Sequence, residues 1–349
     1  MSAWAIVANN EPLQPIEQAP LQAQGCEVVL EVTHAGVCHS DLHLWHGYYN
    51  MGGGKRMMLA DRGVTLPRVP GHEIVGRVVR VGPDAQGVKV GDHRIVFPWL
   101  GCGQCEVCRA GQDNLCNQPC ALGVRQDGGY GKEVKVPHPR FLVDFGDIDP
   151  AFAATLACSG ITVYSAIRKL MPMDPDTPVV LFGAGGLGLA AICMLQALGH
   201  RRIVSVDIGA DKREAALEMG ATAVVDGNAP DLVAAIHAVT GGPVMAAMDF
   251  VNISSTATVG LEILGKSGRL VLVGVGGGEL MVSLAGMIFR PRTVMGSMTG
   301  NPQDLRDVAE LARSGKLKAL PITRMEKDRA NEAVYMLNEG RAKGRIVLV

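Results

Sequence analysis

The sequence predicts two domains, first a β-rich domain and then a doubly wound α/β domain. Three observations support this fold class. The chain has 349 residues, more than twice the roughly 150 residues of an average domain. Short apolar runs bounded by Gly and Pro fill the chain up to about residue 155, and a regular alternation of strand and helix patterns begins at Thr177.

The first part of the chain has the pattern of a β-rich unit. Apolar or alternating runs at 27–33, 74–81 and 133–136 are bounded by turn-forming residues. Many short strands that are separated by turn-forming residues are typical of a sandwich or a barrel. We therefore expect a partly open barrel or sandwich.

The second part alternates strand and helix patterns. Strand-like runs at 179–182, 203–206, 223–225, 245–250 and 269–273 are separated by helical segments at 187–198, up to 220, around 231–239 and up to 264. Such spacing indicates βαβ units and a parallel sheet covered on both faces. The doubly wound domain should span about 157–301.

The tail from Pro302 contains two amphipathic helical segments, 303–314 and 327–338, and an apolar end at 346–349. Periodicity alone leaves two placements open. The tail could complete the second domain or fold back onto the first.

Composition and charge exclude several classes of protein. Apolar residues make up 48% and charged residues 19% of the chain, and 44 glycines are present, which excludes disorder and a coiled coil. The 33 basic and 34 acidic residues give a net charge of −1, which argues against nucleic acid or an anionic membrane as a partner. The sequence shows neither an apolar run of about 18 residues nor a signal-peptide pattern at its start. We expect a soluble, cytoplasmic protein.

Four of the nine cysteines form a local cluster, Cys102, Cys105, Cys108 and Cys116. Four thiolates at this spacing can surround a tetrahedral Zn²⁺ completely, which is typical of structural zinc sites. An iron–sulfur site is the chemical alternative, but the bacterial ferredoxin pattern ends in x3-C-P and this one does not. A nucleic-acid-binding zinc ribbon would explain only this segment.

A glycine-rich turn, Gly183-Ala-Gly-Gly-Leu-Gly188, follows an apolar strand and opens a helix. Gly183 permits a tight turn, Gly185 lets the backbone approach a pyrophosphate, and Gly188 allows close helix packing. Asp207 ends the next strand, 19 positions after Gly188, where a carboxylate can bind ribose hydroxyls. The pattern predicts a dinucleotide site that favours NAD over NADP, although Lys212 and Arg213 lie nearby.

Cys38, His72 and Cys158 are separated by 34 and 86 residues. These separations alone prove nothing. A single cysteine is usually a small buried apolar residue, and a single histidine is usually a satisfied polar group.

The same segments occur in the order found in zinc-dependent medium-chain alcohol dehydrogenases, and this resemblance covers nearly the whole chain. The segments 38–43 (CHSDLH), 45–47 (WHG) and 158–164 (CSGITVY) most resemble the yeast and bacterial branch. The resemblance implies a GroES-like catalytic domain over 1–156, completed by the tail 302–349, and a Rossmann domain over 157–301.

The resemblance also implies roles for individual residues. The catalytic zinc would be bound by Cys38, His72 and Cys158, with Glu73 approaching it transiently. Ser40 would take the proton that the alcohol loses, and His43 would deliver it to solvent. On the general chemistry of metal-bound histidines, and not on the resemblance, we expect Asp41 to accept the ring N–H of His72. The cofactor would be contacted by His39, Thr162, Gly183, Gly185, Gly186, Leu187, Gly188, Asp207, Lys212, Val275 and Arg345.

The expected activity is reversible transfer of a hydride between an alcohol and NAD, giving an aldehyde or ketone, with two Zn²⁺ per subunit. One alternative is an enzyme for a specialised cyclic, aromatic or thioester-linked alcohol. Another is a catalytically silent protein that binds zinc and a nucleotide, but such a protein should have lost a ligand or the relay.

The segment between His46 and Gly71 departs from the yeast-type pattern because it is longer. Its residues 50–64 are either an inconsequential surface insertion or a feature that reshapes the substrate entrance. By resemblance the chain forms a homotetramer or homodimer, with strands near 294–298 extending the sheet between subunits.

Overall fold

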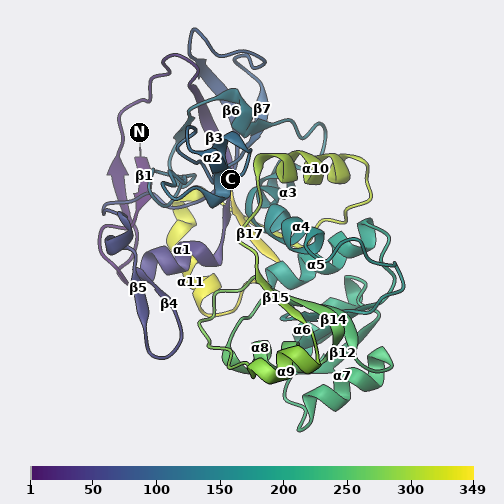
Figure 1. Ribbon diagram of the computed structural model, residues 1–349. Coiled ribbons are helices and arrows are strands. Elements are labelled where there is room, and N and C mark those ends of the chain that lie inside the picture. Colours follow the sequence, from purple (N-terminus) through teal and green to yellow (C-terminus); the bar gives the residue numbers. More distant parts are fainter. Residues whose placement is uncertain (1) are drawn as a thin grey trace.

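The computed structural model describes residues 2–349 and contains two large sheets with helices between and around them (Figure 1). The first sheet has the strand order β16-β17-β3-β6-β7-β9, and β8 also pairs with β3. Its strands are β3 (Val28–Val37), β6 (Glu73–Val81), β7 (His93–Val96), β8 (Glu133–Val136), β9 (Leu142–Val143), β16 (Ile322–Met325) and β17 (Arg345–Leu348). The three strands predicted for this part are confirmed as β3, β6 and β8.

The second sheet is a doubly wound parallel sheet, as predicted. Its order is β12-β11-β10-β13-β14-β15, so the direction of winding reverses between β10 and β13. The strands are β10 (Val179–Phe182), β11 (Ile203–Asp207), β12 (Ala223–Asp226), β13 (Val244–Asp249), β14 (Leu264–Leu272) and β15 (Thr293–Gly296). The helices are α5 (Gly186–Ala197), α6 (Ala210–Glu218), α7 (Leu232–Thr240), α8 (Ser254–Glu262) and α9 (Leu284–Phe289).

Both faces of this sheet are buried because successive side chains of a strand point to opposite faces. Val179 and Leu181 of β10 belong to one apolar core, and Val180 and Phe182 belong to the other. This explains why β10 is apolar at every position. β14 begins five residues earlier than the predicted 269, with a register shift beside Val244 and a positive φ at Ser267, so the pattern of a regular strand is absent there.

The tail returns to the first sheet. After α10 (Pro302–Arg313) and α11 (Ala330–Asn338), strand β17 pairs antiparallel with β3. The first helix matches its predicted range, whereas the second begins as a 3-10 turn over Lys327–Arg329. The exact domain limits 1–156, 157–301 and 302–349 stay a prediction.

One long helical run joins the two parts of the chain. It consists of α3 (Pro150–Thr155), a π-helical turn (Leu156–Gly160) and α4 (Ile161–Arg168). Among the described residues it is the one helix long and apolar enough to cross a membrane, although no such run was expected. Its mean hydropathy reaches 1.4 because apolar residues outweigh the few hydroxyl groups, but 78% of it is buried inside the protein. It is therefore a core helix.

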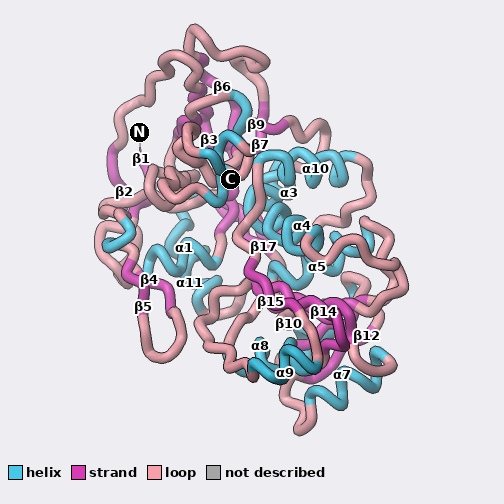
Figure 2. Tube along the Cα trace, in the orientation of Figure 1, coloured by secondary structure: helices cyan, strands magenta, loops and turns pink. Residues whose placement is uncertain are grey.

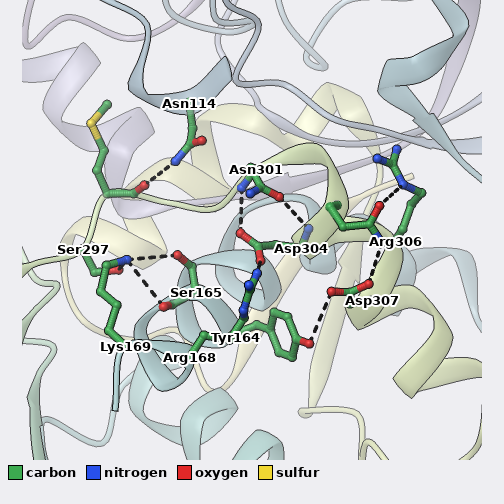
Figure 3. Close-up of polar contacts among 12 residues, drawn as sticks. Asn114, Tyr164, Ser165, Arg168, Lys169, Ser297, Asn301, Asp304, Arg306 and Asp307 are labelled. Carbon is green, nitrogen blue, oxygen red and sulfur yellow. Dashed lines mark hydrogen bonds and ion pairs between the residues drawn. The ribbon is translucent and has the colours of Figure 1, made fainter. Parts of the chain in front are cut away.

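Polar contacts fasten the tail to this helical run (Figure 3). Arg168 pairs with Asp304 at 2.5 Å, and Lys169 donates to Ser297 at 3.0 Å. Asn301 caps α10 by accepting the N–H of Asp304. The start of α10 is thereby fixed to the end of α4.

Short elements complete the first part, and Figure 2 shows that long loops connect them. They are β1 (Ser2–Ala5), β2 (Gln14–Glu17), α1 (His39–His46), β4 (Tyr48–Asn50), β5 (Arg56–Met58), α2 (Glu106–Arg109) and 3-10 turns at Ala60–Arg62, Asp113–Leu115 and Pro139–Phe141. The strands β4 and β5 form an antiparallel hairpin. Residues 50–64, expected to be a surface insertion or a feature of the substrate entrance, thus consist of most of this hairpin and a 3-10 turn.

Candidate active site and metal centres

Three residues far apart in the sequence form a buried cluster between the two parts of the molecule. The ligand atoms of Cys38, His72 and Cys158 all lie within 4.8 Å of one another. The two sulfur atoms are 3.8 Å apart, close to the edge of a tetrahedron with Zn–S bonds of about 2.3 Å. The arrangement therefore fits a zinc ion.

Each of these side chains is placed by a different element. Cys38 is the N-cap of α1, directly after β3. His72 immediately precedes β6, and Cys158 projects from the π-helical turn. π-helical turns occur often at functional sites. No residue pattern in the sequence predicts this one.

Asp41 ties the first two ligands together. Its carboxylate accepts the backbone N–H of Cys38 at 2.9 Å and that of Gly71 at 3.0 Å. Nδ1 of His72 lies 3.3 Å from Oδ1 of Asp41. Nδ1 therefore lies beside the carboxylate without meeting hydrogen-bond geometry, and Nε2 is the other ring nitrogen.

Nε2 of His72 is buried and has no hydrogen-bond partner among the residues that the structure describes. A buried nitrogen without a partner is costly, and a metal ion would satisfy it. The pKa of Cys38 lies well below its ordinary value because Cys158 hydrogen-bonds to it, although burial opposes this, and because His72 lies beside it. Both observations match a thiolate–imidazole metal site.

Glu73 lies next to this cluster and pairs with Arg345 of the last strand, and both residues are fully or almost fully buried. Burial raises the pKa of Glu73 to about 7, and the charge of Arg345 opposes that rise. A Cβ at Gly36 would lie 2.1 Å from Oε2 of Glu73. Only glycine therefore leaves room for this carboxylate.

Ser40 and His43 lie three residues apart on α1, which places both side chains on the same face of the helix. Burial, and then the charge of His39, lower the pKa of His43, so this imidazole is neutral near neutral pH. The ring of Tyr49, on strand β4, lies 4.4 Å from that of His43.

The second metal centre contains the four predicted cysteines. The ligand atoms of Cys102, Cys105, Cys108 and Cys116 lie within 4.8 Å of one another. Backbone N–H groups point at the sulfur of Cys116, at 3.4 Å from Cys102 and 3.3 Å from Gln118. Such donors stabilise thiolates, and all nine cysteines are free thiols.

The glycine turn lies at the carboxyl end of β10, where the winding of the sheet reverses and where such sheets bind ligands. Gly183 has φ 93°, and a Cβ at Gly188 would lie 1.8 Å from the carbonyl oxygen of Gly183. A Cβ at Gly185 would meet no described atom within 4 Å. That position is open toward the expected pyrophosphate.

Asp207 already has two backbone partners. Its carboxylate accepts the N–H groups of Ala184 at 2.7 Å and Gly209 at 2.9 Å. A carboxylate has about four acceptor positions, so capacity for ribose hydroxyls remains. Asp207 thereby also fixes the glycine turn.

The other residues expected to contact the cofactor lie on α1, α4, α5, α6 and β17 and after β14. Burial lowers the pKa of His39 and the charge of Cys38 opposes this, while the charges of Arg345 and Lys212 lower the pKa further. Gly186 lies against Arg345. Leu187 follows on the first turn of α5, Thr162 is buried on α4, and Val275 is half-exposed after β14.

Sequence reasoning missed three aromatic residues of this site. Trp99 lies 5.0 Å from the ring of His72, and the hydroxyl of Tyr130 lies 3.4 Å from Asp41. Tyr49 is the third, against His43. Their neighbours are distant in the sequence, and no local spacing reveals them.

Two family models match the chain: the alcohol dehydrogenase GroES-like domain over 24–147 and the zinc-binding dehydrogenase domain over 186–314. An NAD-dependent alcohol dehydrogenase from Sulfurisphaera tokodaii is 36% identical over 352 residues, covering 100% of both chains. The chain belongs to the zinc-binding alcohol dehydrogenase family. The resemblance stated from the sequence is thereby confirmed.

Other members of the zinc-binding alcohol dehydrogenase family match along their full length. A D-arabinose 1-dehydrogenase (NADP⁺) from Saccharolobus solfataricus is 33% identical, with coverage of 97% of this chain and 95% of the relative. The crystal structure of the alcohol dehydrogenase from Aeropyrum pernix superposes with a TM-score of 0.89 at 31% identity, covering 100% of both chains. The similarity therefore extends over the whole length of the chain.

Proposed function

We propose that this protein is a zinc-dependent alcohol dehydrogenase that oxidises an alcohol reversibly to an aldehyde or ketone with NAD. The observation that carries the proposal is the buried Cys38–His72–Cys158 cluster, whose His72 Nε2 is unpaired among the described residues. This cluster lies between the first part of the chain and the glycine turn Gly183 to Gly188, which is suited to a dinucleotide. The naming of full-length relatives as NAD-dependent alcohol dehydrogenases supports the same activity.

In this proposal Cys38, His72 and Cys158 hold the catalytic zinc, and Cys102, Cys105, Cys108 and Cys116 hold a structural zinc. Zinc would supply a Lewis acid that makes an alcohol hydroxyl more acidic, and NAD would accept the hydride. Asp41 orients His72, and Glu73 is available beside the cluster. The protein must then move one proton out of a buried site.

Ser40 and His43 are suited to carry that proton. A serine hydroxyl both donates and accepts, and the lowered pKa of His43 keeps its ring able to accept a proton near neutral pH. The cofactor would be held by the glycine turn Gly183 to Gly188, by Asp207, and by His39, Lys212 and Arg345 around the pyrophosphate. Thr162, Leu187 and Val275 would flank the nicotinamide.

The test is a panel of primary, secondary, cyclic and aromatic alcohols with NAD and with NADP, followed by the absorbance of the reduced nicotinamide. We expect turnover with NAD, slower turnover with NADP, and two zinc ions per subunit. Removal of zinc by a chelator should abolish turnover. Full activity with a single zinc bound by the four cysteines would contradict the proposal.

Ser40→Ala provides a sharper test of the relay. Loss of a group that transfers protons should lower kcat by about 10²- to 10⁴-fold, while both zinc ions remain bound. Ser314→Ala, an exposed serine at the end of α10, is the control and should leave kcat unchanged. Near-normal turnover of Ser40→Ala would remove Ser40 from the relay.

A specialised substrate is the second candidate. The hairpin β4–β5 reaches across to the dinucleotide-binding part, where a Cβ at Gly52 would lie 2.7 Å from the carbonyl oxygen of Gly278. A hairpin in this place favours a restricted entrance and therefore a more selective enzyme. Deletion of residues 50–64 with retention of fold and zinc should broaden the range of alcohols.

We also propose that the protein forms a homodimer or homotetramer and acts in the cytoplasm. Four apolar side chains on and before α9 are almost fully exposed: Met281 at 96%, Leu284 at 83%, Ile288 at 74% and Phe289 at 79%. They lie close in sequence to β15, the edge strand of the parallel sheet. An apolar surface beside an open sheet edge suits a second copy of the chain.

The proposed location in the cytoplasm rests on the cysteines. Free thiols as zinc ligands suit a reducing compartment.

A further inference from the structure

Arg213, on helix α6, is bound to the turn that follows strand β11. Its Nη1 donates to the carbonyl oxygens of Asp207 at 2.8 Å and Ile208 at 2.9 Å, and its side chain is only 19% exposed. The carboxylate of Asp207 is the group expected to bind the ribose hydroxyls of NAD. A cation is therefore fixed next to the expected ribose site.

The same guanidinium is paired with a second carboxylate. Nη1 and Nη2 of Arg213 each lie 3.2 Å from an oxygen of Asp226. Asp226 ends β12, the strand beside β11, and its Cα lies opposite that of Asp207 in the register of the two parallel strands. The backbone N–H of Asn228 donates to Oδ1 of Asp226 at 3.0 Å. The positive charge of Arg213 is thus offset by an acid that the turn holds in place.

The site contains both of the residue types that select between the two cofactors. In dinucleotide-binding domains an acid binds the ribose hydroxyls of NAD, whereas an arginine accommodates the 2′-phosphate of NADP. The ion pair distinguishes their roles here, because the negative charge of Asp226 cancels part of the attraction between Arg213 and a phosphate.

We propose that Asp226 is a second determinant of the preference for NAD, a positioning residue that acts through Arg213. It keeps the guanidinium in an ion pair and so withholds it from the 2′-phosphate of NADP. The assignment rests on the proposed function, in which Asp207 binds the adenosine ribose. Asp207 repels the phosphate directly, and Asp226 cancels the charge that would attract it.

The variants that test this role change charge and keep hydrogen bonds. Asp226→Asn removes the negative charge but retains an oxygen that can accept the N–H of Asn228. Arg213→Gln removes the positive charge but retains a side-chain donor for a carbonyl oxygen. Asp211→Asn is the matched control, because Asp211 is an exposed acid on the same helix as Arg213, whose ion pair is with Asp226 instead.

The experiment measures the Kd of NADPH and of NADH by fluorescence for each variant. We expect Asp226→Asn to lower the Kd of NADPH about 3- to 10-fold relative to that of NADH, because the guanidinium becomes free to bond to the 2′-phosphate. The gain is modest because Asp226 is 49% exposed and solvent weakens such pairs. Asp211→Asn should change the ratio of the two Kd values less than twofold, on the order of a surface charge effect.

The Arg213→Gln background decides whether Asp226 acts through the guanidinium. There Asp226→Asn should give no larger gain than Asp211→Asn does, because the effects of paired residues are not additive. An equal gain with and without the guanidinium, a gain no larger than that of the control, or no gain at all would overturn the role of Asp226.

The binding measurements require no turnover, so they separate this inference from the proposed function. Failure of the unmodified protein to bind NADH would contradict the proposed function. Tight binding of NADH together with an unchanged ratio of Kd values in Asp226→Asn would refute only the role of Asp226.

Discussion

At the scale of single residues, Asp41 determines the geometry of the catalytic cluster. It accepts backbone N–H groups from Cys38 and Gly71 and lies against the ring of His72. One carboxylate thereby orients the loops before both α1 and β6. A residue that binds no metal can in this way control how well the metal is bound.

Asp41→Asn should weaken binding of the catalytic zinc by about 10- to 100-fold, because one carboxylate oxygen becomes a donor that opposes a backbone N–H. The measurement is the zinc content per subunit after dialysis against chelators of increasing strength, which should fall from two to one. Asp127→Asn is the control, since Asp127 binds Arg68 and Gln18 instead. Retention of both zinc ions in Asp41→Asn would contradict this role.

The two metal clusters differ in how far the sequence predicts them. Cys102 to Cys116 lie within fifteen residues, and their spacing alone indicates a tetrahedral site. Cys38, His72 and Cys158 meet only because β3, β6 and the π-helical turn pack together, which spacing does not encode. Their assignment came from the resemblance, and the roles of individual site residues stay predictions.

At the scale of elements, the glycine turn combines a packing requirement with a binding requirement. Gly188→Ala places a Cβ 1.8 Å from a carbonyl oxygen and should lower the free energy of unfolding by about 1–3 kcal/mol. Gly185→Ala meets no described atom and should keep its Tm, but raise the Kd for NAD about tenfold, ~1.4 kcal/mol. Thermal melting and NADH fluorescence separate the two effects. Equal Tm values for Gly188→Ala and Gly185→Ala would contradict the separate packing and binding roles of the two glycines.

The hairpin provides a second matched pair of glycines. Gly52 and Gly54 have φ of 83° and 74°, so alanine causes similar backbone strain at both. A Cβ at Gly52 meets Gly278, whereas one at Gly54 meets no atom of the described chain within 4 Å. We expect Gly52→Ala to raise the KM for alcohol and for NAD at least about threefold more than Gly54→Ala does, because it disturbs the contact between the two parts. A threefold change corresponds to ~0.7 kcal/mol of free energy.

Steady-state kinetics of both variants provide the test. Equal KM values would show that the contact between the hairpin and the loop after β14 does not affect the site. The hairpin could not be predicted from the sequence, because 50–64 contains glycines and charges without alternation. Its strands are only three residues long and depend on the contacts at its tip.

At the scale of the whole molecule, the exposed apolar side chains of α9 predict association. Phe289→Glu places a charge in that surface and should shift the protein to a smaller species in light scattering after size exclusion. Val90→Glu is the control, a single exposed apolar residue of the first part, and should leave the size unchanged. A monomeric unmodified protein would contradict the prediction.

The doubly wound sheet was predictable as a whole because each βαβ unit is local in the sequence. The residue pattern of the tail did not predict its course, since an apolar end such as 346–349 fits any sheet, and only the resemblance implied that the tail completes the first domain. Its pairing with β3 joins residues more than 300 positions apart. Only the full fold decides between such distant partners.

That pairing also delivers a charge to the catalytic cluster. Arg345 lies on β17 and forms a buried ion pair with Glu73, which sits beside His72. The strand that closes the first sheet therefore also neutralises the acid next to the metal ligands, and loss of β17 would leave that buried acid without its counter-charge.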